Sequence, residues 1–339
     1  MGTRAATPLL DTFDLGAAWI WPSMQPELAR LTVDLGISTF DQYETGDVMV
    51  ESSALEAPRR IQQHMSGDNG WVRIVNGMGS LVSACSSQLD KSKIKLNEVV
   101  KEISYIGRDK SFGSSDLILI STENRNGQRR IHRAKTVILA LPPRLVADSI
   151  KFDPPLPETT MHEYKATPTW MANAAKYLAV YEKPFWREQG LSGDVFSRVG
   201  PMAEIHDATS HDGSAALVGF LATKRQPGVP NQPELMNACR EQLGRIFGKD
   251  ALKTEGEVIK DWSTEVFTAT PDDRVQSRGH ATSSPPISPV DGVWAGQLVG
   301  VSSEWSPVHP GFIAGAVDAA NRGYQEIQRS YTRTLGSDT

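Results

Sequence analysis

A single lysine, Lys176, stands in a run of small, aromatic and aliphatic residues at positions 175–181. An ammonium group that is buried without a partner is costly. The lysine is therefore either solvated at the edge of a strand or held by a specific polar group. We favour the second interpretation, because its immediate neighbours are apolar. Lys176 is then a candidate for a functional site.

The closing run, residues 300–316, is predicted to lead from a strand into a helix. Residues 293–294 and 297–299 before it are predicted to be short extended segments. Small residues recur where the helix should begin, at Gly311, Ala314 and Gly315. The first turn of a helix has unpaired backbone N–H groups and the positive end of the helix dipole, so it suits a carbonyl oxygen or a pyrophosphate. The alternative is a helix that packs closely in a core.

An acid, a histidine and a second acid occur together at Glu204, His206 and Asp207. Alternation along a strand places Glu204 and His206 on one face and Asp207 on the other. No third ligand is evident for a metal ion, so we predict hydrogen-bonded structural roles and no metal site. The cysteines, Cys85 and Cys239, are far apart and form no CxxC pair, and no GxSxG hydrolase motif is present.

Composition indicates an ordinary globular protein. The chain has 339 residues, 39% hydrophobic and 22% charged, which is long enough for two domains with their own cores. A net charge of -5 argues against a nucleic-acid partner or a polybasic membrane surface, so small molecules are the expected partners. The sequence has no signal-peptide pattern and no apolar run near the ~20 residues of a membrane helix. We therefore expect cytoplasmic residence, with a homo-oligomer left open.

The first half of the chain is predicted to mix helices and strands. Apolar residues at helical spacing predict a helix from Leu28 to Leu35 that Gly36 ends, and a second helix follows Gly79. The sequence at 77–82 resembles a dinucleotide fingerprint, but Val82 replaces its third glycine, so we predict that it is not one. Strands are predicted at 94–96, 99–106, 117–122 and 131–141, with a turn at 126–127. The run 135–144 is predicted to be a strand buried on both faces of a parallel sheet.

The second half changes character after residues 152–156. Strands are predicted at 175–181, 216–222 and 257–262, with a helix at 233–247, which is typical of an antiparallel domain with one helical cover.

Several ordered motifs make the chain resemble the flavin monoamine oxidase family from Arg4 to about Tyr324. The motifs are residues 13–19, 140–143, 152–156, 184–187 and the closing run. The long insertion of animal members is absent between Gln42 and Trp71, so the chain resembles the compact microbial branch.

The resemblance implies an α/β fold, in α+β two-domain form. An incomplete FAD-binding Rossmann-like domain would comprise residues 1–43, 71–151 and 285–330. An antiparallel-sheet substrate domain would comprise 152–284, with a variable connector at 44–70 and a tail at 331–339.

The resemblance also implies FAD as the cofactor and assigns roles to particular residues. Lys176 matches the lysine that holds a water at the flavin N5 in this family, and Phe312 and Phe267 are candidates for an apolar pocket that keeps the amine neutral. Either phenylalanine could instead be plain core. The residues expected to contact the cofactor are Arg4, Gly16, Ala17, Ala18, Val100, Trp262, Gly300, Glu304, Gly311 and Phe312.

The expected reaction is oxidation of an amine to an imine, with reoxidation of the flavin by oxygen. Small-molecule amines and oxygen would be the partners. The family's N-terminal GxGxxG unit is not found, so we expect a fragment or a start site placed too late. The alternative is a non-catalytic or assembly-dependent protein that cannot hold FAD alone because its nucleotide-binding unit is missing.

Overall fold

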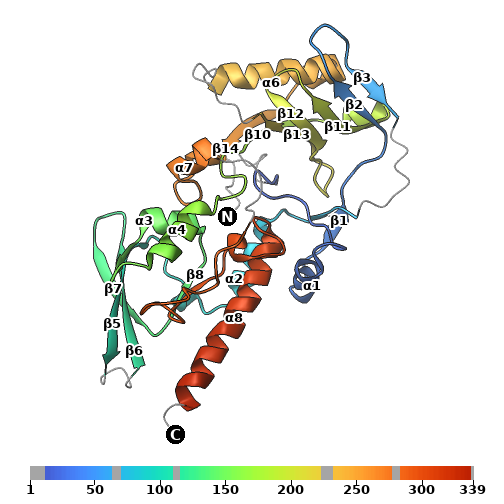
Figure 1. Ribbon diagram of the computed structural model, residues 1–339. Coiled ribbons are helices and arrows are strands. Elements are labelled where there is room, and N and C mark those ends of the chain that lie inside the picture. The colour runs from blue at the N-terminus through green and yellow to red at the C-terminus, as the bar shows by residue number, and fades with distance from the viewer. Residues whose placement is uncertain (1–11, 63–69, 110–114, 223–231, 277–282, 337–339) are drawn as a thin grey trace. The chain divides into compact units, whose positions relative to one another are not determined.

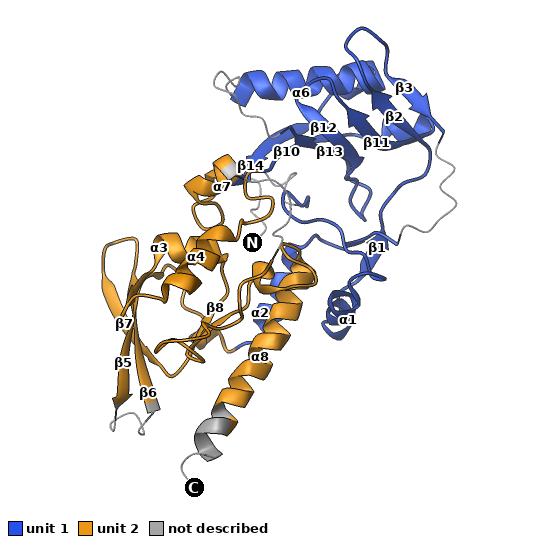
Figure 2. Cartoon of the chain, in the orientation of Figure 1, with its two compact units in different colours: residues 1–89, 174–262 blue, residues 90–173, 263–339 orange. Residues whose placement is uncertain are grey.

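The computed structural model describes residues 12–62, 70–109, 115–222, 232–276 and 283–336 (Figure 1). Arg4 lies outside the described residues. The chain divides into two compact units, coloured separately in Figure 2: unit 1 is residues 1–89 and 174–262, and unit 2 is residues 90–173 and 263–339. These units divide the chain at other points than the domains predicted from the sequence, which remain a prediction.

Unit 1 is built on a sheet with the strand order β14-β10-β13-β12-β11-β2-β3. Neighbouring strands are antiparallel except for β11 and β2, which are parallel. The strands predicted near 175–181, 216–222 and 257–262 are confirmed. The bounds are β2 Asp47–Glu51, β3 Arg59–Ile61, β10 Ala175–Tyr181, β11 Leu191–Ser197, β12 Met202–Asp207, β13 Ala215–Leu221 and β14 Gly256–Asp261.

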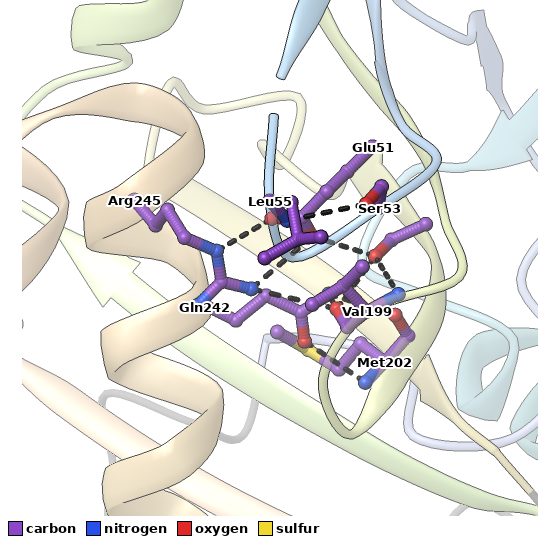
Figure 3. Close-up of polar contacts among 8 residues, drawn as sticks. Glu51, Ser53, Leu55, Val199, Met202, Gln242 and Arg245 are labelled. Atoms are coloured by element: carbon purple, nitrogen blue, oxygen red, sulfur yellow. Dashed lines mark hydrogen bonds and ion pairs between the residues drawn. The ribbon is translucent and has the colours of Figure 1, made fainter. Parts of the chain in front are cut away.

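The long helix α6, Gln232–Phe247, covers one face of this sheet (Figure 1). Its apolar side and the strands beneath it share a buried cluster that includes Tyr177, Leu217 and Leu243. Polar contacts fix the helix to the strand ends (Figure 3): Gln242 exchanges hydrogen bonds with the backbone of Met202, and Arg245 pairs with Glu51. The predicted helix is confirmed, and it leaves the opposite face of the sheet for other partners.

The opposite face is covered in part by the segment that begins the described chain. Phe13 and Leu15 pack against Leu178 of β10 and Val218 of β13 in a second buried cluster. This packing explains why residues 13–19 belong to the same unit as strands more than 150 residues further along the chain. Contacts of this kind cannot be read from a local pattern.

Shorter elements complete unit 1. The helix α1 ends just before Gly36, which has a φ of 67°, so the predicted stop signal is confirmed. Strands β1 and β4 pair antiparallel with each other. The bounds are α1 Pro26–Asp34, β1 Thr39–Asp41, β4 Val72–Ile74, α2 Gly79–Ser87, α5 Phe185–Glu188, η4 Lys249–Leu252 and η5 Trp262–Thr264, the last of which runs into unit 2.

Unit 2 contains a four-stranded sheet with the strand order β7-β6-β5-β9, which includes the strands predicted at 99–106 and 117–122. The turn at Asn126 and Gly127 connects β6 to β7 as expected, with Gly127 at a φ of 75°. The strand predicted at 94–96 is wrong: Ile94 and Leu96 are exposed and follow a 3-10 turn, so no neighbour pairs them into a sheet. The bounds are η2 Lys91–Lys93, β5 Val99–Asp109, β6 Ser115–Glu123, β7 Arg129–Ala134 and β9 Lys151–Asp153.

A parallel pair, β8 Val137–Leu139 and β15 Leu298–Gly300, forms the other sheet of unit 2. The parallel pairing agrees with the prediction, but burial on both faces does not, because Ile138 is 54% exposed. Its neighbour Val299 is buried, and the helix α8, Ile313–Gly336, packs on β15 there through Gly323. The segment predicted as extended at 293–294 is a turn. The remaining bounds are α3 Pro143–Ser149, α4 Glu158–Ala166, α7 Pro271–Gln276 and η6 Ser303–Trp305.

None of the described helices has the length and apolar character needed to cross a membrane.

Candidate functional site

Lys176 lies on β10, on the face of the sheet opposite α6. Its side chain is only 4% exposed, and its Nζ donates a hydrogen bond to the backbone oxygen of Gly16 at 2.5 Å. The polar partner expected from the sequence is therefore the loop at residues 13–19. Burial lowers the pKa of the Lys176 ammonium to about 8, against the opposing attraction of Asp14. Such a lysine can exchange a proton near neutral pH.

Aromatic rings surround this ammonium group. Lys176 Nζ lies 4.8 Å from the ring centre of Phe220 and 5.6 Å from that of Trp19. Trp19 is held in place because its Nε1 donates to Gln42, which in turn donates to the backbone oxygen of Asp207. Sequence reasoning missed Phe220 and Trp19, because the residue that lies across a sheet from Lys176 depends on strand register.

The loop that receives Lys176 also meets Trp262. The indole Nε1 of Trp262 donates to the backbone oxygen of Leu15 at 2.9 Å. A Cβ on Gly16 would lie 3.2 Å from the Trp262 ring, so the close contact favours glycine. Ala17 is exposed and Ala18 is buried in the same loop. Unit 1 therefore brings together the predicted residues Gly16, Ala17, Ala18, Lys176 and Trp262.

The glycine segment at 77–82 has its own internal partner. The carboxylate of Asp14 accepts a hydrogen bond from the Met78 N–H at 2.8 Å and lies against Gly77. Burial raises the pKa of Asp14, which this hydrogen bond partly offsets. The strand before the segment, β4, is antiparallel to β1 rather than part of a parallel sheet. A carboxylate already lies at the start of α2, so this segment does not suit a pyrophosphate.

The closing run of unit 2 is packed tightly against its own neighbours. A Cβ on Gly300 would lie 2.0 Å from the Trp305 ring, and one on Gly315 would lie 2.0 Å from the backbone oxygen of His309. Gly311 has a φ of 83° and lies against Trp170. The fold of unit 2 itself therefore requires these small residues. This agrees with the alternative given in the sequence analysis, a helix that packs closely in a core.

Two side chains of the closing run have defined surroundings. The Phe312 ring lies 4.6 Å from the Trp170 ring, centre to centre. Glu304 is buried, and one of its oxygens accepts a hydrogen bond from Ser302 Oγ at 2.6 Å. Unit 2 therefore brings together Gly300, Glu304, Gly311 and Phe312.

Two other predicted residues of unit 2 lie elsewhere in it. Val100 is on β5 opposite Thr122 and packs at the edge of the unit's core. Phe267 is 69% exposed in the loop between η5 and α7. The pocket role of Phe267 remains a prediction.

The acidic and histidine residues of β12 form part of a polar cluster. His206 Nδ1 lies 2.8 Å from Asp194 and its Nε2 lies 3.7 Å from Glu204. Asp207 points to the other side of the strand, where Trp186 and Arg187 donate to it. In the part of the chain that the structure describes, no group of three or more His, Cys, Asp or Glu could hold a metal ion.

Comparison with known proteins adds a family. The family described as flavin containing amine oxidoreductase matches residues 44–327. Putrescine oxidase of Kocuria rosea is 31% identical over 202 residues, which cover 58% of this chain and 41% of that protein. The flavin-containing amine oxidase of Danio rerio is 26% identical over 247 residues, 69% of this chain and 43% of that protein. The chain thus spans less than half the length of these two relatives.

The fold has solved counterparts. A structure of wild-type putrescine oxidase bound to putrescine superposes with a TM-score of 0.74, covering 93% of this chain and 88% of that chain at 18% identity. Cyclohexylamine oxidase from Brevibacterium oxydans superposes with a TM-score of 0.73 at 14% identity. These likenesses support the predicted mixed α/β fold.

Proposed function

Because the chain belongs to the flavin containing amine oxidoreductase family, we propose that the whole protein is an FAD-dependent amine oxidase. Flavin is the cofactor of this family. The proposed substrates are a small-molecule amine and oxygen. The amine loses two electrons and becomes an imine, which water hydrolyses to a carbonyl compound and ammonia or a smaller amine, and oxygen takes up the two electrons as hydrogen peroxide. When bound, the flavin takes up the hydride equivalent from the carbon next to the amine.

The observation that carries the proposal is the surroundings of Lys176. A buried ammonium with a pKa near 8, bound to the Gly16 backbone and lined by Phe220 and Trp19, is costly to maintain for stability alone. Lys176 has N–H donors beyond the one that Gly16 receives, so it can orient a water or a flavin atom. Desolvation in this apolar environment and the positive charge of Lys176 disfavour the ammonium form of an amine and so favour a neutral reacting nitrogen.

The residues present fit the ring of a flavin better than its nucleotide tail. In unit 1, Lys176 supplies an ammonium group, and the Gly16 loop supplies backbone that lies within hydrogen-bonding distance of it. In unit 2, the start of α8 carries the positive end of a long helix beside Phe312. For the tail, the segment at 77–82 is blocked by Asp14. We therefore propose that Lys176 and the Gly16 loop of unit 1 would contact the isoalloxazine.

The second candidate is an assembly-dependent protein that acquires its nucleotide-binding unit from elsewhere. Exposure of Ile138 on β8, beside buried Val299, favours it, since an apolar residue in a parallel strand is normally covered. The cytoplasmic location expected from the sequence likewise remains a proposal, and the sequence leaves a homo-oligomer open.

An absorbance spectrum separates the two candidates. Purified protein, as isolated or after addition of FAD, should show a flavin band that an amine bleaches without oxygen and that air restores. Colourless protein that is folded and monodisperse, yet binds no added FAD, would contradict the first candidate and support the second.

A further inference from the structure

A small pocket in unit 1 is lined by the paired strands β1 and β4 and by the loop that joins β12 to β13. All of its lining residues belong to unit 1, and none of them is among the residues that surround Lys176. Its volume of about 50 Å³ has room for roughly four groups of the size of a water molecule. We call it the Arg73 pocket. Its lining includes Phe40, Arg73, Asn76, His211 and Asp212.

Arg73 is the buried charged group of this pocket. Its side chain belongs to a residue that is only 5% exposed, and its two terminal nitrogens donate to the backbone oxygens of Thr209 at 2.8 Å and Ala208 at 3.1 Å. Its Nε is buried and has no hydrogen-bond partner. In the described part of the chain, the guanidinium forms no ion pair with a carboxylate. The two carbonyl groups therefore orient the guanidinium without neutralising its charge.

Burial of this charge is costly. It lowers the pKa of Arg73, and the attraction of Asp14 and Asp207 only partly offsets that effect. A buried donor without a partner adds a further cost. An anion that accepts hydrogen bonds from the guanidinium would supply both the missing charge and the missing acceptor.

The Phe40 ring limits how a ligand can approach Arg73. The guanidinium carbon lies over this ring, 5.1 Å from its centre, and the ring of His211 lies 5.5 Å from the same centre. Phe40 thus covers one face of the guanidinium. Its N–H groups all point along the plane of the group, so hydrogen bonds form at the edge. A flat carboxylate matches such an edge.

Two uncharged donors stand at the outer part of the pocket. His211 and Asn76 are both exposed residues that line it. An imidazole N–H or a side-chain amide can donate to the oxygen of a ligand that also reaches Arg73. The donors of the pocket therefore come from the β4 side and from the loop opposite it.

Asp212 limits the charge of the ligand. Its carboxylate accepts hydrogen bonds from Ser210 Oγ at 2.5 Å and from the Ser214 N–H at 3.0 Å, and these bonds lower its pKa. A negative charge is therefore fixed on the wall of the pocket, and Asp14 lies against Gly77 on the other side. A dianion such as phosphate is repelled more strongly than an anion with a single charge.

We propose that the Arg73 pocket binds a small monocarboxylate, whose oxygens accept hydrogen bonds from the Arg73 guanidinium and the His211 ring. Phe40, Ile74 and Val75 line the same pocket and would contact the hydrocarbon part of the ligand. The pocket volume restricts that part to a few carbons. This site is separate from Lys176, and the inference does not depend on the proposed oxidase function.

The test compares propionate with propionamide, an uncharged molecule of nearly the same shape. Isothermal titration calorimetry on the purified full chain, in a mildly alkaline buffer of low salt, gives both dissociation constants. Propionate should bind at least about tenfold more tightly, as expected for a charge-assisted hydrogen bond. Equal affinities would overturn the proposal.

Inorganic phosphate tests the limit on ligand charge. In the same buffer it is a dianion, and it should bind at least about tenfold more weakly than propionate because of Asp212. Phosphate that binds as tightly as propionate would contradict the assignment to a monocarboxylate.

Two exposed neighbours should change propionate binding in opposite directions. His211→Ala removes a donor and should weaken binding by about threefold to tenfold. Asp212→Asn keeps the shape and an acceptor oxygen but removes the negative charge, so binding should become severalfold tighter. A general loss of structure would weaken binding in both variants, and that result would overturn the proposal.

Matched controls locate the effect in the pocket. His162→Ala removes an exposed histidine of unit 2, and it should leave the affinity for propionate unchanged. Lys176→Met should also leave it unchanged, since Lys176 does not line the pocket. Loss of propionate binding in a folded Lys176→Met variant would assign the carboxylate to the lysine and contradict the proposal.

Arg73→Lys tests the central residue. Lysine keeps the positive charge but loses the planar edge, so propionate should bind at least about tenfold more weakly and should no longer raise the melting temperature. Circular dichroism establishes whether this variant folds, because Arg73 is buried. If it does not fold, the opposite changes at His211 and Asp212 decide the outcome. A folded Arg73→Lys variant with the affinity of the unaltered protein would overturn the proposal.

Discussion

The Lys176 row of unit 1 and the closing run of unit 2 are both marked by unusual residues, but the structure explains them differently. The row is the set of paired residues on one face of the unit 1 sheet: Lys176, Phe220 and Glu204. In the closing run, Gly300 is required by Trp305, and Gly311 by its positive φ and by Trp170. In the row, a buried ammonium and a half-exposed carboxylate face the same side of a sheet. The fold accounts for the first set, whereas burial of the Lys176 ammonium costs free energy that packing alone does not require.

This difference separates two kinds of evidence for function. A glycine that touches its own protein says little about a cofactor, even when it stands in a family motif. Charged side chains kept apart by Phe220 across one sheet face say more, because packing alone would prefer apolar residues there. Variants can test this difference: those in the closing run should affect folding, and those around Lys176 should affect activity.

The largest effect is expected at Gly300. A Cβ there would lie 2.0 Å from the Trp305 ring, which is buried and cannot move aside, so Gly300→Ala should destabilise the protein by about 3 kcal/mol or more. Thermal melting measures this loss. Gly79→Ala is the control, because a Cβ on Gly79 meets nothing within 4 Å at the start of α2, and it should be nearly neutral. An unchanged melting temperature with loss of bound flavin would instead give Gly300 the cofactor role predicted from the sequence.

Lys176→Met should show the opposite behaviour. Methionine fills a similar volume without a charge, so stability should hold or rise slightly. In flavin-loaded protein, loss of the ammonium should slow flavin reduction or reoxidation by about a hundredfold, equivalent to about 2.7 kcal/mol, as for a positioned proton-transfer group. Stopped-flow absorbance measures both half-reactions. Wild-type rates together with a marked loss of stability would make the lysine a structural residue.

A pH series tests the cluster beside the row. The pKa of His206 is raised from its ordinary value of 6.5 to about 9 in the folded protein, so the protonated ring favours folding. This stabilisation is complete below about pH 6.5 and disappears as the pH rises through 9. The difference in unfolding free energy between wild type and His206→Gln should therefore shrink by about 2 kcal/mol over that interval, measured by urea titration.

Asp194 and Glu204 are the charged groups that face this ring, and the Trp19 and Phe220 rings pack against it. The control is the double variant Asp194→Asn with Glu204→Gln. In that background, His206→Gln should give a difference that no longer shrinks between pH 6.5 and 9. A slope that survives removal of both carboxylates would assign the raised pKa to some other interaction.

The sequence predicts the elements near the site better than the contacts among them. The strand at 175–181, the helix at 233–247 and the stop at Gly36 follow from periodicity and glycine chemistry, which act over a few residues. The strand at 94–96 failed because an apolar alternation without a pairing neighbour is not held extended.

The arrangement of the site depends on contacts between residues that are more than a hundred positions apart in the sequence. Gly16 meets Lys176 although 160 positions separate them, and the row joins strands whose register no local pattern gives. Motif matching therefore found Lys176 and the Gly16 loop but missed Phe220 and Trp19, and Glu204 was predicted to have only a hydrogen-bonded structural role. The exposure of Ile138 was not predicted, because an apolar run predicts a buried strand whether or not both faces of the strand are covered.

The smallest effect is expected at Phe267. A variant at this residue of unit 2 can be compared with one at Phe220 of unit 1. The ring is 69% exposed within its loop, so Phe267→Ala should change the free energy of unfolding by no more than about 0.5 kcal/mol. Phe220→Ala, which removes a ring from the Lys176 row, is the matched variant in unit 1. Calorimetric binding of butylamine should weaken severalfold for Phe220→Ala, because that ring lies 4.8 Å from the lysine ammonium. If Phe267→Ala weakens butylamine binding as much while stability is unchanged, the pocket role predicted for Phe267 holds.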